Sequence, residues 1–147
     1  MTELLIKRLN DSDADIPLPG YATAHAAGLD IRVNAAIEIA PGAVFLAPTG
    51  IALEIPEGYE GQVRPRSGLA AQHGITCLNS PGTIDADYRG ELKIILINHG
   101  KETVRFERGM RIAQLIISKY EKVNVVEAGE LAESVRAAGG FGHTGTK

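Results

Sequence analysis

Hydrophobic and polar residues alternate along most of this chain, and glycines and prolines interrupt the alternation at short intervals. Runs with a period of two that are rich in β-branched residues are typical of strands with one buried face. About ten such runs are expected to form strands: residues 4–9, 31–33, 37–39, 43–46, 50–55, 61–64, 75–78, 91–98, 103–106 and 111–118. Pro48, Thr49 and Gly50 are expected to form a turn between two of these strands.

Helical periodicity is nearly absent from the sequence. The one helix that we predict in the body spans residues 68–73, with Ser67 as its N-cap. Many short strands separated by frequent turns indicate a sandwich, a jelly roll or a closed barrel. The sequence therefore predicts an all-β protein.

The composition changes after Val126. Residues 127–138 are rich in alanine and glutamate, and residues 139–147 contain four glycines. Such a segment is typical of a flexible extension rather than of a packed strand. We therefore expect residues 1–126 to form the β body and residues 127–147 to form a mobile arm.

The overall composition is that of one globular domain. The chain has 147 residues, of which 44% are hydrophobic and 22% charged, and this balance excludes a mainly disordered chain. No apolar run is long enough to span a bilayer, and residues 1–10 do not resemble a secretory signal, so we expect a cytoplasmic protein without membrane contact. The single cysteine, Cys77, has no partner for an internal disulfide and is expected in the core.

The net charge limits the class of ligand. A formal charge of −3 argues against binding to a long polyanion, so nucleic acid is not an expected partner. A small phosphorylated ligand remains compatible with this charge, because its pocket needs only a few cations and backbone N–H groups.

The glycine-rich tail is the first candidate for chemistry. Residues 140–145 match the pattern GxGxxG, but no strand precedes them and no helix can follow, so the dinucleotide-binding fold is excluded. Glycines, Thr144 and free N–H groups suit phosphate oxygens, and Phe141 offers a flat face to a base. The alternative is a frayed terminus.

The second candidate is the segment 82–90. In an extended chain Asp85 and Asp87 point to the same face, so one carboxylate could act as a general base while the other orders Arg89 or Tyr88. The alternative is a solvated hairpin with acidic turn residues.

The third candidate is the segment 64–70, where two arginines meet Ser67 at the start of the predicted helix. Guanidinium groups, a hydroxyl and free backbone N–H groups attract an oxyanion or a phosphate. An edge strand with surface arginines is the alternative. Residues 27–31 and 109–115 carry no chemistry when taken alone, and Gln114 is there interpreted as an interior amide.

Taken in order, these segments resemble the five motifs of the trimeric dUTPases, at residues 27–31, 65–70, 82–98, 107–115 and 136–145. The resemblance extends from residue 21 to 147. It implies a distorted jelly roll, either barrel or sandwich, that assembles as a homotrimer with active sites shared between subunits. It also implies hydrolysis of dUTP to dUMP and pyrophosphate with Mg²⁺, which lowers dUTP and supplies dUMP for thymidylate synthesis.

The resemblance assigns roles around the nucleoside. Asp85 matches the carboxylate that orients and deprotonates the water attacking the α-phosphorus. Asn79 matches the amide that reads the uracil edge, together with the main chain of Thr83, Ile84 and Lys93. Tyr88 matches the ring that packs against deoxyribose and excludes a 2′-hydroxyl.

It also assigns roles around the triphosphate. Arg66, Ser67 and Gly68 match a phosphate-binding turn, and Gln114 matches a further phosphate contact. Asp30 resembles the motif-one aspartate, which reaches the metal through a water. The arm is implied to close over the active site of a neighbouring subunit, and its matching residues are Arg136 at the γ-phosphate, Phe141 over the uracil, and His143, Thr144 and Gly145 around the phosphates.

Two departures and two alternatives accompany the resemblance. Leu29 stands where many relatives carry an aromatic residue, and Ala137 and Ala138 replace a glycine-containing approach to the tail. A dCTP deaminase of the same fold, including bifunctional forms, is one alternative, and an inactive nucleotide-binding regulatory module is another. The Asp85 segment and the tail with Phe141 favour hydrolysis at phosphorus over both.

Overall fold

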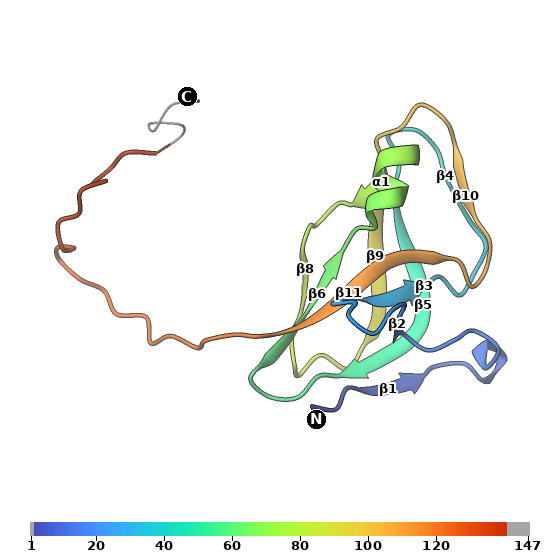
Figure 1. Ribbon diagram of the computed structural model, residues 1–147, viewed down its shortest axis with the longest axis horizontal. Helices are drawn as coiled ribbons and strands as arrows, with labels where there is room; N and C mark the ends of the chain where they lie inside the picture. The colour runs from blue at the N-terminus through green and yellow to red at the C-terminus, as the bar shows by residue number, and fades with distance from the viewer. Residues whose placement is uncertain (1, 141–147) are drawn as a thin grey trace.

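Two β-sheets and a two-stranded ribbon form the body of the protein (Figure 1). The computed structural model describes residues 2–140. Its strands are β1 (Leu5–Arg8), β2 (Gly20–Tyr21), β3 (Leu29–Arg32), β4 (Ile37–Ile39), β5 (Val44–Glu54), β6 (Tyr59–Arg64), β7 (Ile75–Cys77), β8 (Gly82–Ile84), β9 (Glu91–Asn98), β10 (Val104–Phe106) and β11 (Arg111–Lys119). The helices are the short 3₁₀ helix η1 (Asp11–Asp13) and the α-helix α1 (Ser67–His73).

All strand pairs are antiparallel, and the two sheets stay open at their edges. One sheet has the order β1-β5-β9-β7 and the other β2-β3-β11-β6-β8, while β10 pairs with β4. The all-β jelly-roll prediction is confirmed, in its sandwich form rather than as a closed barrel. Within residues 2–140, no helix is both long and apolar enough to cross a membrane.

Alternation along the strands builds the core between the two sheets. On β9, Leu92, Ile94 and Leu96 are buried while Lys93 is exposed between them. Each fully buried aliphatic side chain contributes about 1.5–3 kcal/mol relative to an exposed one. Cys77 belongs to this core as expected, and burial raises the pKa of its thiol to about 11.

The turn predicted at residues 48–50 is wrong. Strand β5 continues through these residues and shifts its register with β9 between Pro48 and Ala52. Gly50 has a φ of 69°, a conformation that glycine adopts easily, and its N–H donates to Glu91 Oε1 at 3.0 Å. Proline, threonine and glycine therefore bend a continuous strand here instead of ending it.

The predicted N-cap is also wrong. Ser67 is the first residue of α1, and Arg66 takes the N-cap position with φ −92° and ψ 125° and without a side-chain cap. A guanidinium cannot accept the hydrogen bond that a serine oxygen would accept. The side chain of Arg66 is engaged elsewhere, as described below.

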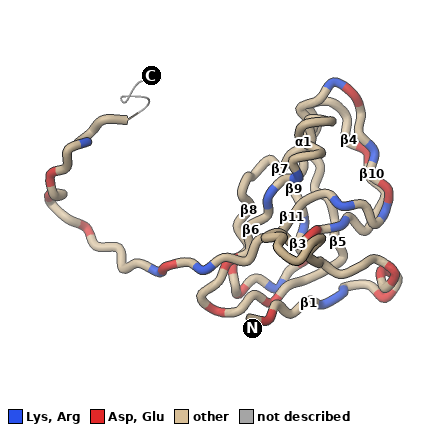
Figure 2. The backbone as a smooth tube through the Cα atoms, in the orientation of Figure 1, with Lys and Arg blue, Asp and Glu red and all other residues tan. Residues whose placement is uncertain are grey.

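The extended segment begins earlier than the predicted residue 127, directly after β11, and from here on we call residues 120–140 part of the arm. Residues 120–140 contain no helix or strand, and the chain there leads away from the body (Figure 1). Its apolar side chains are largely exposed, with 75% of Val123 and 89% of Leu131 accessible. Acidic and basic positions are interspersed along both body and arm (Figure 2). The apolar side chains of the arm therefore make little contact with the body of the same chain.

A buried carboxylate fastens the N-terminal segment to the body. Asp13 is only 5% exposed and accepts hydrogen bonds from Asn34 Nδ2 at 2.9 Å and from Arg108 at 3.1 Å. Arg108 also binds Asp15 at 2.7 Å. A Cβ atom at Gly50 would collide with the Asp13 carboxylate. The bend of β5 therefore makes room for this cluster.

Acid should weaken this cluster. The hydrogen bond from Asn34 and the nearby Arg108 lower the pKa of Asp13, and the hydrogen bond with Arg108 lowers the pKa of Asp15 to about 2. Because the folded protein holds fewer protons on these groups than the unfolded chain, their stabilisation is complete above about pH 4 and is lost as the pH falls towards 2. Between pH 5 and pH 2.5, we expect the melting temperature of Arg108→Ala to fall less than that of the wild type.

Thermal unfolding followed by circular dichroism measures this difference. Arg105→Ala is the matched control, because it removes an exposed ion pair with Glu38 and should change stability little. Equal pH dependence of the wild type and Arg108→Ala would contradict the assignment.

Candidate functional site

Five of the predicted site residues line one cavity, which we call the hairpin pocket after the hairpin considered for residues 82–90. That hairpin is not formed, because β8 pairs with β6 and β9 pairs with β5 and β7. Thr83, Ile84, Asp85, Tyr88 and Lys93 surround a cavity of about 320 Å³ together with Leu46, Glu91 and Ile95. They come from β8, from the loop that follows it and from β9, whereas Leu46 comes from β5. The pocket therefore combines polar groups with an apolar wall, as is common for sites that bind a small organic ligand.

Strand pairing sets the position of the segment that carries Asp85. Ile84 pairs with Gly61 of β6, and a Cβ on Gly61 would lie 3.2 Å from the Cβ of Ile84. After β8, Ala86 packs against the core while Asp85 and Asp87 are exposed, as the alternation predicts. Asp85 also lines a second cavity of about 640 Å³ with Asp87 and Arg89, so this residue borders both cavities.

Asp87 does not order its neighbours, and this part of the prediction is wrong. Arg89 donates to the carbonyl oxygens of Ala86 at 2.6 Å and Tyr88 at 3.1 Å, and it forms an ion pair with Glu54 at 3.8 Å. Main-chain acceptors and a carboxylate on β5 therefore hold the guanidinium.

Close contact with a glycine fixes the ring of Tyr88. Its hydroxyl donates to the carbonyl oxygen of Glu91 at 3.0 Å, and a Cβ on Gly90 would collide with the ring, 2.6 Å from Cζ. Tyr88 is 46% exposed and lines the hairpin pocket. Asn79 lies beside the pocket rather than in its wall, with Nδ2 2.8 Å from the position of a Cβ on Gly82.

A second group of predicted residues, which we call the arginine cluster, surrounds Asp30. Arg111 Nη1 lies 2.9 Å from Asp30 Oδ2, and Arg66 Nε lies 3.7 Å from Oδ1. Arg66 also donates to the carbonyl oxygen of Arg111 at 3.1 Å. Two guanidinium groups thus share one carboxylate, and the cluster retains a net positive charge that attracts anions.

The turn into α1 lies beside the arginine cluster. Gln114 Nε2 donates to the carbonyl oxygen of Pro65 at 2.9 Å, directly before Arg66 and Ser67. Within the helix the first backbone bond comes from Ala70 N–H, so the N–H groups of Ser67 and Gly68 have no intrahelical acceptor. The turn therefore offers backbone donors next to the two guanidinium groups.

The hairpin pocket shares one sheet with the arginine cluster only through β8, because β9 and β5 belong to the other sheet. Gln114 of β11 pairs with Arg64 of β6, and Thr83 of β8 pairs with Gln62, two residues earlier on β6. Residues two apart share a face, so Gln114 and Thr83 face the same side, with β6 between them and about 10 Å between their strands. No hydrogen bond or ion pair among residues 2–140 joins the two groups directly.

The remaining predicted residues lie in the arm. Arg136 Nε donates to the carbonyl oxygen of Gly139 at 2.8 Å, within the arm itself. Phe141, His143, Thr144 and Gly145 lie outside the described residues. Sequence reasoning missed Arg111, whose partner Asp30 is 81 positions away, although both lie in segments of the dUTPase-like pattern.

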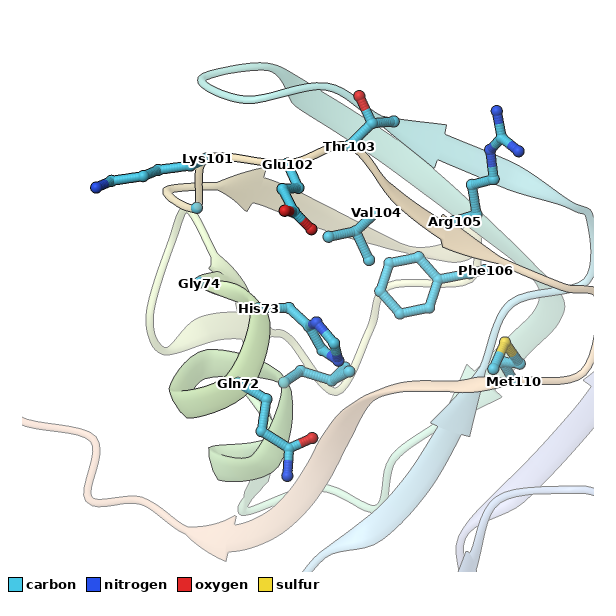
Figure 3. A pocket seen from close by; sticks show the side chains of 12 residues that line it. Gln72, His73, Gly74, Lys101, Glu102, Thr103, Val104, Arg105, Phe106 and Met110 are labelled. Atoms are coloured by element: carbon cyan, nitrogen blue, oxygen red, sulfur yellow. The ribbon is translucent and has the colours of Figure 1, made fainter.

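A larger cavity than the hairpin pocket lies elsewhere in the described chain. It measures about 670 Å³ and lies between α1 and β10, with Leu69, Val104, Phe106 and Met110 among its lining side chains (Figure 3). None of the predicted site residues that fall within residues 2–140 lines it. Chemistry, rather than cavity size, therefore identifies the candidate site.

Comparisons with known proteins give one consistent result. The family model for dUTPase matches residues 14–145. The deoxyuridine 5′-triphosphate nucleotidohydrolase of Rickettsia massiliae (strain Mtu5) is 54% identical over 147 residues, which cover 99% of this chain and 98% of that protein. The enzyme of the same name from Thermoanaerobacter sp. (strain X514) is 53% identical over 144 residues, 97% of each chain.

The fold comparison agrees. The solved structure of Staphylococcus bacteriophage 80alpha dUTPase with dUpNHpp has a TM-score of 0.90 and 26% sequence identity, and the match covers 99% of each chain.

Proposed function

Because the chain belongs to the dUTPase family and hydrolyses dUTP, we propose that the hairpin pocket and the arginine cluster bind opposite ends of this substrate. The observation that carries the proposal is the meeting of Thr83, Ile84, Asp85, Tyr88 and Lys93 in one pocket. The uracil edge forms hydrogen bonds with the main chain of Thr83 and Ile84 on β8, with that of Lys93 on β9, and with the side chain of Asn79. The ring of Tyr88 packs against the deoxyribose.

Asp85 acts as the general base. Its carboxylate takes a proton from a water molecule whose oxygen forms a bond to the α-phosphorus, while the bond between that phosphorus and the bridging oxygen breaks. The products are dUMP and pyrophosphate, and the proton passes from Asp85 to solvent. Arg66 neutralises charge on the leaving pyrophosphate, and Ser67 lies near the bridging oxygen.

Gln114 and Gly68 complete the phosphate-binding turn, and Arg136 of the arm reaches the γ-phosphate. The net positive charge of the arginine cluster supports this assignment. The predicted contacts of Phe141, His143, Thr144 and Gly145 belong to the same proposal, in which the arm closes over the bound nucleotide and excludes water.

The donor groups fit a Mg²⁺ ion that the substrate itself carries. Within residues 2–140, no three His, Cys, Asp or Glu side chains lie close enough together to hold a metal ion. Both carboxylate oxygens of Asp30 face arginines. Mg²⁺ prefers phosphate oxygens and water, so Asp30 would reach it through a water. When bound, the ion supplies charge neutralisation on the triphosphate.

We place the hairpin pocket and the arginine cluster of one site on different subunits of a homotrimer. An apolar patch adjoins the pocket on the outer face of β5 and β9, where Val44 and Leu46 are 51% and 54% exposed and pair with Ile97 and Ile95. Such a patch and the exposed valines of the arm favour contact with further copies of the chain.

Removing the base tests the reaction. We expect Asp85→Asn to bind dUpNHpp with nearly wild-type affinity but to lose about 10²- to 10⁴-fold in turnover of dUTP. Pyrophosphate release with Mg²⁺ present, measured for dUTP, dCTP and UTP, gives the readout. Near-normal turnover by Asp85→Asn would refute its role, and ammonia released from dCTP by the wild type would favour the deaminase.

Sugar discrimination tests Tyr88. Because its ring leaves no room for a 2′-hydroxyl, UTP should be a very poor substrate, and Tyr88→Ala should reduce the preference for dUTP over UTP by at least about 10-fold. Tyr88→Phe is the control, since it keeps the ring and loses only the bond to the Glu91 carbonyl. Equal hydrolysis of dUTP and UTP by the wild type would contradict the assignment.

Mixing two inactive variants tests the shared site. Suppose that Asp85 and Arg66 of one site come from different subunits. When equal amounts of Asp85→Asn and Arg66→Ala are unfolded, mixed and refolded, about a quarter of all sites then combine an intact Asp85 with an intact Arg66. The mixture should therefore regain about a quarter of wild-type activity. Each variant refolded alone is the control. No recovery in mixed trimers of confirmed mass would place both residues on one subunit.

A further inference from the structure

Gly28 is a glycine for reasons of space rather than of backbone conformation. It precedes β3 and is not among the glycines with positive φ, so its backbone would accept other residues. A Cβ atom at this position would lie 2.5 Å from Gln114 Oε1, 3.2 Å from Gln114 Cβ and 3.3 Å from Gln114 Cδ. The side chain of Gln114 therefore occupies the volume that any other residue at position 28 would need.

The amide of Gln114 uses this space to hold the turn into α1. Its Nε2 donates to the carbonyl oxygen of Pro65 at 2.9 Å, which links β11 to the chain between β6 and α1. Two other links hold this turn, and both are made by the side chain of Arg66. One is the ion pair with Asp30 and the other is the hydrogen bond to the Arg111 carbonyl. Of these three links, only that of Gln114 holds the backbone of the turn.

This backbone link matters because the helix lacks a side-chain cap. Arg66 at the N-cap position offers no acceptor to the first N–H groups of α1. The direction of these groups is then determined by how the preceding peptide is held. That peptide joins Pro65 to Arg66, and Gln114 binds its carbonyl oxygen.

We propose that Gly28 is a positioning residue: by leaving room for the Gln114 amide to bind the Pro65 carbonyl, it fixes the turn that presents Arg66 and Ser67 to the triphosphate. The inference rests on the proposed function of that turn. Gly28 touches no reacting atom and acts through Gln114. It therefore affects binding of the triphosphate more than binding of the nucleoside.

Gly28→Ala tests the proposal. We expect its affinity for dUpNHpp to fall about 3- to 10-fold, the effect of one intramolecular hydrogen bond, while its affinity for dUMP changes less than about 2-fold. The KM for dUTP should rise with the same ratio. A loss of stability alone would lower the active fraction but would leave KM and both affinities of the folded protein unchanged.

Gly20→Ala is the matched control. Gly20 lies on β2, the neighbour of β3, and a Cβ there would meet no atom closer than Leu18 O at 3.8 Å. We expect this variant to bind dUpNHpp as the wild type does.

A double-mutant cycle shows whether Gly28 acts through Gln114. Gln114→Ala should lower the affinity for dUpNHpp at least as much as Gly28→Ala does, and the double variant should lose no more than Gln114→Ala alone. Additive losses would overturn the proposal.

Hydrogen exchange separates positioning from direct contact and does not require Gly28→Ala to fold. In the protein without nucleotide, Gln114→Ala should speed exchange of the Ala70 amide, whose bond to the Arg66 carbonyl closes the first turn of α1; loss of a phosphate contact alone would not do this. Unchanged exchange would overturn the proposal. Absence of dUTP hydrolysis by the wild type would instead refute the proposed function.

Discussion

The pairing of β11 with β3 on one side and β6 on the other is the constraint on which the site depends. This central strand places Asp30, Gln114 and Arg64 in one row across the sheet. The same register turns Leu29, Leu115 and Val63 into the core. Because side chains alternate along a strand, a slip of one residue would exchange the two faces, burying the polar row and exposing the apolar one. The same pairing therefore stabilises the fold and aligns the site.

Local periodicity explains how much of the fold could be predicted. The alternation on β9 specifies a strand with one buried face, and it does so without knowledge of any neighbour. The run at Pro48 to Gly50 misled the prediction, because these residues form a turn when the flanking strands pair with each other. Here β5 pairs with β9 and β1 instead, and the same residues form a bulge. The information that distinguishes the two outcomes is tertiary.

The candidate site could be predicted in its residue types but not in its contacts. The order of the motifs identified Asp85, Tyr88 and Lys93, and the fold brings them into one pocket. The carboxylate partner of Arg89 could not be read from nearby sequence, because Glu54 lies on β5, far along the chain. The role of Gly28 was hidden for the same reason, since only the packed structure shows what occupies the space beside it.

The burial of Cys77 has a practical consequence. Its thiol is 2% exposed, its pKa is raised to about 11, and the chain has no other cysteine. The thiolate is the form that reacts with maleimides, so the native sulfur stays inert at neutral pH. A cysteine introduced into the arm, for example in place of Ser134, would be the sole labelling point for a fluorophore. The emission of that fluorophore would then report changes in the surroundings of the arm during turnover, and the label would not alter the core.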